Sequence, residues 1–230
     1  MRARYRAVVF DLFGTLLRFR VRPDPAFTWL RDAFEASTAA ADFDAFRAAL
    51  VAVSKEIAAE RAPEHREVAS RERFARALAR VGLGGAAAEA LSATHMGYLA
   101  AATELPAGHG DLVRELSARY RLGLVSNFDH PPTAQAVLAR HGIHRCFAAT
   151  LISADVGRRK PHPEIFAEAL TRLGVAPPEA LFVGDTHAED VVGARGAGLD
   201  VAWLAPADAP DPEPRPTIRI TRLDELTAWL

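Results

Sequence analysis

The hydrophobic positions of the chain follow two different rhythms. A short apolar run, Ala7–Phe10, ends directly at Asp11, and a continuous run of this kind predicts a fully buried strand of a parallel sheet. In residues 24–103 the apolar positions instead recur at helical spacing, in segments rich in alanine, leucine, arginine and glutamate. No strand pattern interrupts these segments, so the region is predicted to form a bundle of about four helices.

Beyond residue 105, short strands and helices alternate. Strands are predicted at residues 122–127, 150–153, 181–183, 201–204 and 217–220, and helices at 111–119, 132–141, 163–173 and 190–196. Such alternation is typical of βαβ units and a parallel sheet. The pattern predicts an α/β fold: a Rossmann-like, three-layer core formed by residues 1–17 and 105–230, and a small all-helical domain at 18–104.

The composition narrows the classes of protein. Hydrophobic residues make up 50% of the 230 and charged residues 25%, with a net charge of −1, as in ordinary globular proteins. Arginine is scattered among acidic residues, so we expect no nucleic-acid partner. No apolar run approaches the roughly 20 residues of a membrane span, so we expect no membrane partner either.

Cys146 is the only cysteine, and the chain therefore forms no internal disulfide. The apolar run after the basic N-terminus is too short for a signal peptide. We expect a cytoplasmic protein, monomeric or homodimeric, that acts on a small molecule.

Polar side chains gather where the predicted strands end. Ligands of open parallel sheets bind beyond the carboxyl ends of the strands, which makes these positions the ones to inspect. They are Asp11, Ser126, Asn127, Lys160, Asp185 and Asp190. An isolated aspartate after a strand is more often a turn or cap residue, and an isolated lysine is usually solvated. Two carboxylates, a lysine and a hydroxyl at one edge instead form a complete site for an anion bound through a divalent metal.

Each residue type suits that chemistry. Asp11 and Asp185 can hold Mg²⁺, a hard cation that prefers carboxylate oxygen. Lys160 supplies a positive charge for a phosphate, while Ser126 and Asn127 add hydrogen-bond donors.

Four segments around these residues resemble the signature motifs of the haloacid dehalogenase-like hydrolase superfamily, in that family's order. They are FDLFGTL at 10–16, LVSN at 124–127, RKPHPEIF at 159–166 and FVGDTHAED at 182–190. The helical insert lies between the first and second motifs, where that family carries a cap of its first type. The resemblance implies a Rossmann-like core with a helical cap.

The resemblance also implies a mechanism. Asp11 would attack phosphorus to give an aspartyl-phosphate, which water then cleaves. Lys160 would stabilise the pentacoordinate state, and Ser126, Asn127 and Lys160 would bind the phosphoryl group.

The same resemblance implies a metal site and an activity. Mg²⁺ would be held by Asp11, the backbone carbonyl of Phe13 and Asp185, with Asp190 helping directly or through water. The implied function is that of a Mg²⁺-dependent phosphatase acting on a small phosphorylated metabolite.

Phe13 departs from the phosphatase pattern and keeps two alternatives open. Most phosphatases of the family carry a second aspartate there, and losing a general acid typically costs about 10² to 10⁴ in rate. The family's dehalogenases have an aromatic residue there, because a halide leaves without a proton. They work without a metal, however, and differ from this chain at Gly184, Asp185 and Phe166. A metal-independent 2-haloacid dehalogenase with an aspartate nucleophile, and a weakly active binding module, are the alternatives.

A phosphatase without an aspartate at position 13 needs another acid or a good leaving group. Asp129, His130, His162 and His187 are the candidates near the strand ends, although each could equally be a capping residue. Two further expectations concern packing: Cys146 belongs to the core, and Phe27 and Trp29 pack within the cap.

Overall fold

The computed structural model describes residues 5–20, 24, 26–38 and 41–230. Its main sheet has six strands in the order β5-β4-β1-β6-β7-β8, and every neighbouring pair is parallel. The strands are β1 (Ala7–Phe10), β4 (Arg121–Ser126), β5 (Phe147–Ile152), β6 (Ala180–Gly184), β7 (Asp200–Leu204) and β8 (Ile218–Ile220). This arrangement confirms the predicted α/β class and places β1 inside the sheet.

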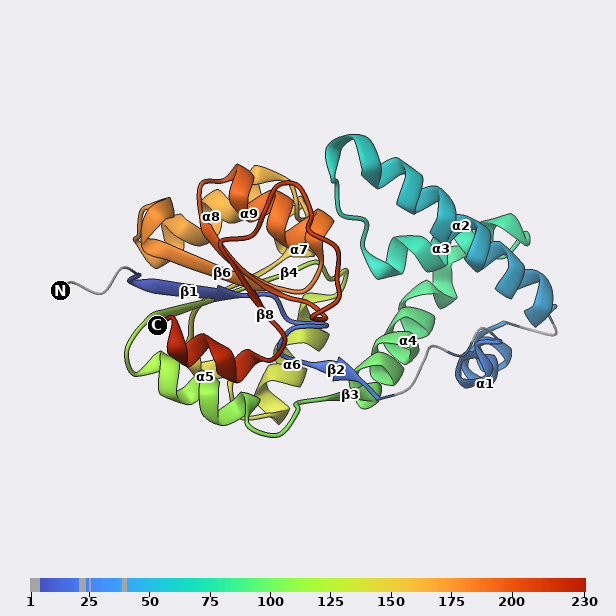
Figure 1. Cartoon of the computed structure of the whole chain (residues 1–230). Helices are drawn as coiled ribbons and strands as arrows, with labels where there is room; N and C mark the ends of the chain where they lie inside the picture. The colour runs from blue at the N-terminus through green and yellow to red at the C-terminus, as the bar shows by residue number, and fades with distance from the viewer. Residues whose placement is uncertain (1–4, 21–23, 25, 39–40) are drawn as a thin grey trace.

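Helices cover both faces of this sheet, which explains why its inner strands are apolar on both sides (Figure 1). Successive residues of β1 point to opposite faces. Val8 and Phe10 pack on the side of α5 (His109–Ser117), α6 (Pro131–Arg140) and the 3₁₀-helix η5 (Leu223–Ala228). Ala7 and Val9 pack on the side of α8 (Pro163–Leu173) and α9 (Val192–Gly196). The core therefore lies in two layers, one on each face.

The short elements sit in the connections. They are α7 (Ser153–Val156), the 3₁₀-helices η2 (His144–Cys146) and η3 (Pro177–Glu179), and the single π-helical turn η4 (His187–Val191). The sequence pattern assigned residue 153 to a strand, but the chain already turns into α7 there.

Four helices stand to one side of the sheet (Figure 1). They are α1 (Thr28–Ser37), α2 (Phe43–Glu64), α3 (Ser70–Arg80) and α4 (Ala88–Ala102), with a 3₁₀-turn η1 (Gly85–Ala87) before α4. Their apolar sides enclose a separate core in which the rings of Phe34 and Phe46 stack with centroids 4.5 Å apart. The helical content matches the pattern, while the assignment of 18–104 as a cap domain stays a prediction.

A small two-stranded ribbon joins the helical region, which runs from α1 to α4, to the sheet region, which is the six-stranded sheet with its covering helices. The sequence pattern did not predict this ribbon. Strand β2 (Arg18–Phe19) pairs antiparallel with β3 (Thr103–Glu104), so the chain leaves and re-enters the core at adjacent positions. Strands of two residues are too short to show an alternating pattern, which is why the periodicity gave no sign of them. Among the described residues, no helix is both long and apolar enough to cross a membrane.

Candidate active site

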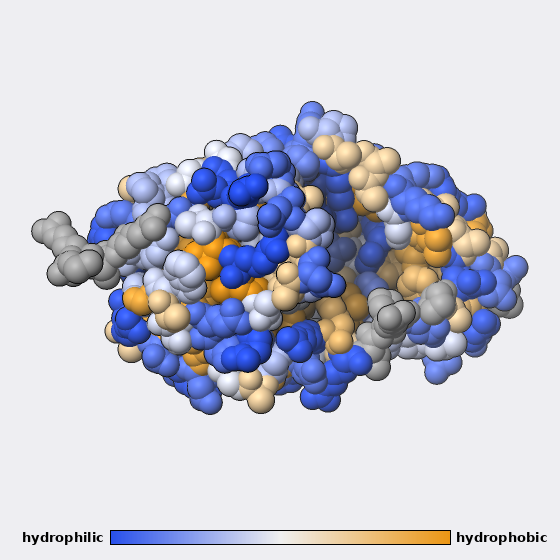
Figure 2. Space-filling model, viewed as in Figure 1, coloured by the Kyte–Doolittle hydropathy of each residue, from blue (hydrophilic) through white to orange (hydrophobic). Residues whose placement is uncertain are grey.

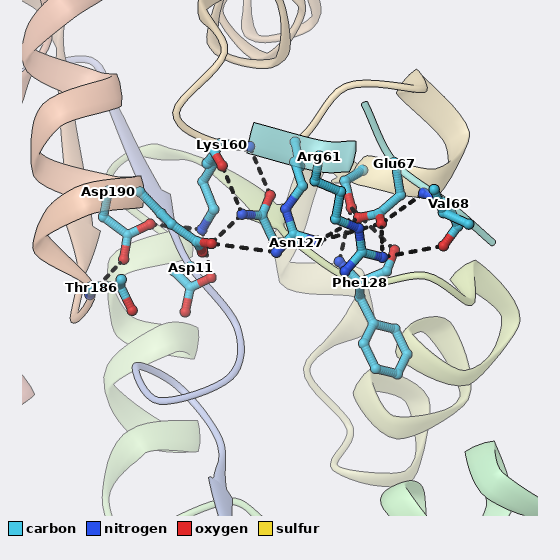
Figure 3. Close-up of polar contacts among 12 residues, drawn as sticks. Asp11, Arg61, Glu67, Val68, Asn127, Phe128, Lys160, Thr186 and Asp190 are labelled. Atoms are coloured by element: carbon cyan, nitrogen blue, oxygen red, sulfur yellow. Dashed lines mark hydrogen bonds and ion pairs between the residues drawn. The ribbon is translucent and has the colours of Figure 1, made fainter. Parts of the chain in front are cut away.

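Lys160 lies between two aspartates in the interior of the protein. Its Nζ is 2.6 Å from Asp11 Oδ1 and 2.7 Å from Asp190 Oδ1. All three side chains are buried, with 8% or less of each exposed. Figure 3 shows the three side chains pointing toward one another. Residues separated by up to 179 positions in the sequence, from 11 to 190, therefore meet at one point.

Backbone geometry places the two aspartates. Asp11 follows β1, and its N–H donates to the carbonyl of Val183 on β6 at 2.9 Å. Asp190 lies in η4, where its Oδ2 accepts a hydrogen bond from Thr186 N at 2.9 Å. A π-helical turn is uncommon and is often found at functional sites. Both carboxylates thus lie just beyond the carboxyl ends of β1 and β6.

Lys160 does not follow a strand directly but lies in the loop between α7 and α8. The side chain of Asn127 fixes it there: Lys160 N donates to Asn127 Oδ1 at 2.7 Å, and Asn127 Nδ2 donates to Lys160 O at 3.0 Å. Asn127 Nδ2 also donates to Glu189 Oε2 at 2.8 Å. The side chain of Asn127 is therefore engaged with protein groups, and its predicted contact with phosphate stays a prediction.

Asp185 completes the carboxylate group. Its Oδ1 accepts a hydrogen bond from Thr15 Oγ1 at 3.2 Å, and its carbonyl accepts one from Trp203 Nε1 at 2.9 Å. Gly14, at φ 100°, passes so close that a Cβ there would lie 2.3 Å from Asp185 Oδ2. Only glycine fits this turn, which explains the glycine three residues after Asp11.

The arrangement fits a divalent metal. One oxygen from each of Asp11, Asp185 and Asp190 lies within 4.8 Å of the others. Asp11 Oδ2 is buried and accepts no hydrogen bond within the part of the chain that the structure describes. Carboxylate oxygens in such a group are the ligands that Mg²⁺ prefers. The predicted contribution of the Phe13 carbonyl stays a prediction.

Burial and neighbouring charges shift the pKa values of the site residues. Burial raises the pKa of Asp11 to about 7, with Lys160 opposing the rise and Asp190 adding to it. Burial also raises the pKa of Asp185, again with a contribution from Asp190. For Lys160, burial disfavours the ammonium, but the two neighbouring carboxylates outweigh it and raise its pKa. Three carboxylates against one ammonium leave the site short of positive charge, which a bound cation would supply.

Two further predicted residues, Ser126 and Phe13, have defined surroundings. Ser126 is the last residue of β4 and is 1% exposed. Phe13 packs its ring 4.8 Å from that of Phe128 and 5.4 Å from that of Phe19, centroid to centroid. The position two residues after Asp11 therefore holds an aromatic ring packed against other aromatic rings, and no acidic group.

Each of the three histidine candidates for a general acid forms a hydrogen bond with another protein group. His130 Nδ1 bonds Thr133 Oγ1 at 2.9 Å near the start of α6, and His162 Nδ1 accepts from Glu164 N at 3.3 Å at the start of α8. His187 Nε2 bonds the carbonyl of Pro214 at 3.1 Å. These are the capping and loop roles that the sequence left open beside the catalytic one.

Asp129 differs from these histidines. Its carboxylate lies 3.7 Å from Arg73 Nη2 of α3, with 15% of its side chain exposed. Burial raises its pKa, with Arg73 opposing the rise. Asp129 is therefore the candidate that keeps a partly buried carboxyl close in sequence to Ser126.

Two packing expectations are settled by contacts. Trp29 stacks on Tyr98 at 4.5 Å and on His95 at 5.0 Å, and Phe27 packs 5.7 Å from Trp29, centroid to centroid. Cys146 is half-buried at the edge of the core rather than inside it.

Three polar residues of the site were missed from the sequence. Thr15 follows Asp11 closely enough that its hydroxyl could have been suspected. Glu67 and Glu189 gave no signal, because their partners lie far away along the chain. Glu67 lies after α2, yet Ser153 Oγ of α7 donates to its Oε2 at 2.5 Å.

The helical region and the sheet region meet at a hollow lined with hydrophilic residues (Figure 2). A cavity of about 360 Å³ opens there beside Lys160. Its lining includes Arg61 and His65 from the helical region, with Arg159, Lys160 and Glu189 from the sheet region. The cavity therefore lies between the two regions, next to the segment that carries Lys160.

Comparison with known proteins gives one family for most of the chain. Residues 5–198 match the family model described as haloacid dehalogenase-like hydrolase. A glyceraldehyde 3-phosphate phosphatase of Methanopyrus kandleri is 43% identical over 94 residues, which are 39% of this chain and 40% of that protein. The chain thus matches about two fifths of the length of the curated relative.

Two solved structures resemble the whole chain. The HAD-hydrolase YfnB of Bacillus subtilis, solved bound to magnesium, is 25% identical, with a TM-score of 0.66 over 99% of both chains. The 2-haloacid dehalogenase of Pseudomonas syringae pv. Tomato is 24% identical, with a TM-score of 0.74 over 98% of this chain and 100% of that one. The second likeness concerns the fold alone.

Proposed function

The chain belongs to the haloacid dehalogenase-like hydrolases, and from this premise we propose that it is a Mg²⁺-dependent phosphatase of a small phosphorylated metabolite. One observation carries the proposal: the carboxylates of Asp11, Asp185 and Asp190 lie together, the first and third buried and Asp185 half-buried, beside the single ammonium of Lys160. Within the described residues, Asp11 Oδ2 accepts no hydrogen bond. A dehalogenase that works without metal has no use for so much unbalanced negative charge. The phosphatase name of the Methanopyrus relative supports the same choice.

Asp11, Asp185, Asp190 and the carbonyl of Phe13 would hold the metal. When bound, Mg²⁺ would neutralise charge on the carboxylates and on the phosphate, so that a carboxylate can approach phosphorus.

The chain's own residues would carry the reaction. A carboxylate oxygen of Asp11 attacks phosphorus, the bond to the leaving group breaks, and an aspartyl-phosphate forms. Water then attacks phosphorus and releases phosphate, which restores Asp11. Lys160 orients Asp11 through its 2.6 Å contact and stabilises the negative charge of the transferring group. Ser126 would donate to that group through its hydroxyl, and Asn127 through its backbone N–H, because its side-chain amide already bonds Lys160 and Glu189.

The leaving group is the point at which Phe13 matters. Its apolar ring cannot donate a proton, so we propose that the preferred substrates have good leaving groups, such as acyl phosphates. For ordinary monoesters, Asp129 is the carboxyl that would serve as acid, since burial raises its pKa.

We propose further that residues 18–104 form a cap domain that excludes water and selects the substrate. The hollow beside Lys160 supports this, because its wall comes from both regions. A cytoplasmic location and a monomeric or homodimeric state are parts of the same proposal.

A second candidate function rests on Phe13 itself. An aromatic residue at that position suits the release of halide, so 2-haloacid dehalogenation without metal is the alternative.

One experiment separates the two functions. Phosphate release is measured on a panel of phosphomonoesters and acyl phosphates with Mg²⁺ and with EDTA, beside halide release from 2-chloropropionate. We expect phosphate release that EDTA abolishes and no halide release. Turnover that persists in EDTA, or halide release in its place, would refute the phosphatase proposal.

A further inference from the structure

We propose that Glu67 is a positioning residue through which the helical region controls the orientation of Lys160. As far as it concerns catalysis, this inference rests on the proposed function. The inference is based on an unbroken series of polar contacts from Glu67 to Asp11, which Figure 3 shows in part. Glu67 belongs to the segment between α2 and α3, whereas Lys160 and Asp11 belong to the sheet region.

Glu67 is the buried end of this series. Only 1% of its side chain is exposed, and its carboxylate is shared between the two regions. Arg61 of α2 donates to it at 2.5 Å, while Ser153 Oγ donates at 2.5 Å and Arg159 Nη1 at 3.3 Å from the other side. A buried carboxylate needs such partners, so its position depends on groups from both regions.

The series continues from Arg159 to the nucleophile. Arg159 Nη2 donates to Glu189 Oε1 at 3.3 Å, and Glu189 Oε2 accepts from Asn127 Nδ2 at 2.8 Å. Asn127 holds both the N–H and the carbonyl of Lys160, and Lys160 Nζ reaches Asp11. Displacing Arg159 would leave Glu189, and with it Asn127, free to shift.

Backbone hydrogen bonds connect the same two segments. Glu67 N donates to the carbonyl of Gly157 at 3.0 Å, and Arg159 N donates to the carbonyl of His65 at 2.8 Å. Arg66 and Arg158 form an antiparallel bridge between these bonds. Backbone contacts therefore dock residues 65–67 against the segment before Lys160.

The Glu67 carboxylate contacts both Arg61 of α2 and Arg159 of the sheet region, and these contacts connect the docking to the helical region. Removing the charge leaves Arg61 and Arg159 without their shared buried partner, and breaking a buried pair in this way is strongly destabilising locally. Arg159 keeps Glu189, so we expect a local rearrangement at residues 157–160 rather than unfolding. The series of contacts is a physical route, and coupling along it has to be measured.

The test compares Glu67→Gln with Glu56→Gln by hydrogen exchange and by kinetics. Glu56 is the matched control: it is on α2 and pairs with Arg80 at 2.6 Å, but on the exposed surface of the helices. We expect Glu67→Gln to speed amide exchange at Arg159 and, beyond it, at Lys160, by about ten-fold, and Glu56→Gln to change neither. Faster exchange at the Arg159 amide with an unchanged rate at the Lys160 amide would overturn the proposal. This measurement needs no enzyme activity.

The kinetic arm uses p-nitrophenyl phosphate with Mg²⁺. We expect kcat to fall about ten-fold with a smaller change in KM, and the effects of Glu67→Gln and Glu189→Gln to be non-additive, as for members of one network. Fully additive effects would contradict the proposal. If the wild-type protein releases no phosphate, the proposed function fails, while the exchange experiment still decides the role of Glu67. Should Glu67→Gln not fold, Glu67→Asp keeps the charge, shortens the reach and must show the same change at the Lys160 amide.

Discussion

The carboxyl ends of the sheet strands and the helical region differ in where their charged side chains lie. At the carboxyl ends of the strands, Lys160 is buried between Asp11 and Asp190. In the helical region the interior holds phenyl rings, and away from buried Glu67 at the contact with the sheet region, charges pair on the surface, as Arg80 does with Glu56. Burying charges is costly, so a chain whose helices follow the ordinary pattern is expected to depart from it only where function requires it. The contrast separates residues that serve chemistry from residues that serve folding.

The largest expected effect tests the chemical side of this contrast. Asp11→Asn removes the nucleophilic carboxylate but keeps nearly the same shape. We expect phosphate release to fall by roughly 10⁴-fold or more, because the amide of asparagine does not act as the nucleophile that forms the covalent intermediate. Initial rates of phosphate release with Mg²⁺ measure this, and circular dichroism checks the fold. A loss of less than ten-fold would mean that Asp11 is not the nucleophile.

The next effect tests the folding side. Phe34→Ala removes a fully buried ring that stacks on Phe46 inside the helical region. We expect the free energy of unfolding to fall by about 3–5 kcal/mol, measured by urea denaturation. Val51→Ala, at an exposed position of α2, is the control and should change stability by about 0.5 kcal/mol or less. Similar losses for both variants would show that this region lacks a tightly packed core.

Phe13 lies at the boundary of the comparison, as an apolar residue inside the charged site. We expect Phe13→Asp to raise kcat for phosphomonoesters with poor leaving groups by up to about 10²-fold, because the new carboxyl can donate a proton. Phe19→Asp is the control, since it places a carboxyl in the same aromatic stack but on the ribbon. An unchanged rate for Phe13→Asp would mean that another residue, such as Asp129, already serves as the acid.

The smallest expected effect concerns a titratable ring in the helical region. Burial, with a contribution from Arg73, lowers the pKa of His95 from 6.5 to about 3. Between these values the unfolded chain binds a proton that the folded chain does not, so stability falls as the pH is lowered from 6.5 toward 3. At pH 5 we expect this histidine to cost about 2 kcal/mol relative to pH 7.

Comparison with His95→Phe isolates this contribution. The substitution keeps a ring between Trp29 and Phe74 and removes the titration. The difference in unfolding free energy between pH 7 and pH 5 should shrink by that amount in urea titrations. An equal pH dependence in both proteins would show that His95 is protonated without penalty.

Much of the fold could be predicted because it depends on local patterns. Ala7–Phe10 and Pro163–Leu173 have the predicted bounds, since each is a clear apolar run or a periodic segment with a definite start. Other bounds shift by a few residues, because the ends of elements depend on tertiary contacts such as those that turn the chain into α7 at Ser153. The ribbon of β2 and β3 had no pattern to detect.

The site was predictable as a set of residues but not as a set of contacts. Asp11, Lys160 and Asp190 do meet, as their motifs indicated. That Asn127 holds the backbone of Lys160 could not be predicted, because a side-chain amide can face either a ligand or a neighbouring loop. Glu67 was invisible for a different reason: its partners in the sheet region, Ser153 and Arg159, lie 86 and 92 positions away.

The ribbon of β2 and β3 bears on how such proteins could be recombined. Both covalent connections between the helices and the sheet pass through Arg18–Phe19 and Thr103–Glu104, which pair with each other. An insert whose two ends are neighbours can be exchanged without changing the register of the host sheet. The helical segment is therefore a natural cassette for chimeras. A foreign insert grafted at these two junctions would meet an unchanged Asp11, while the docking of residues 65–67 and the contacts of Ser70 and Arg73 with Asp129 would need to be rebuilt.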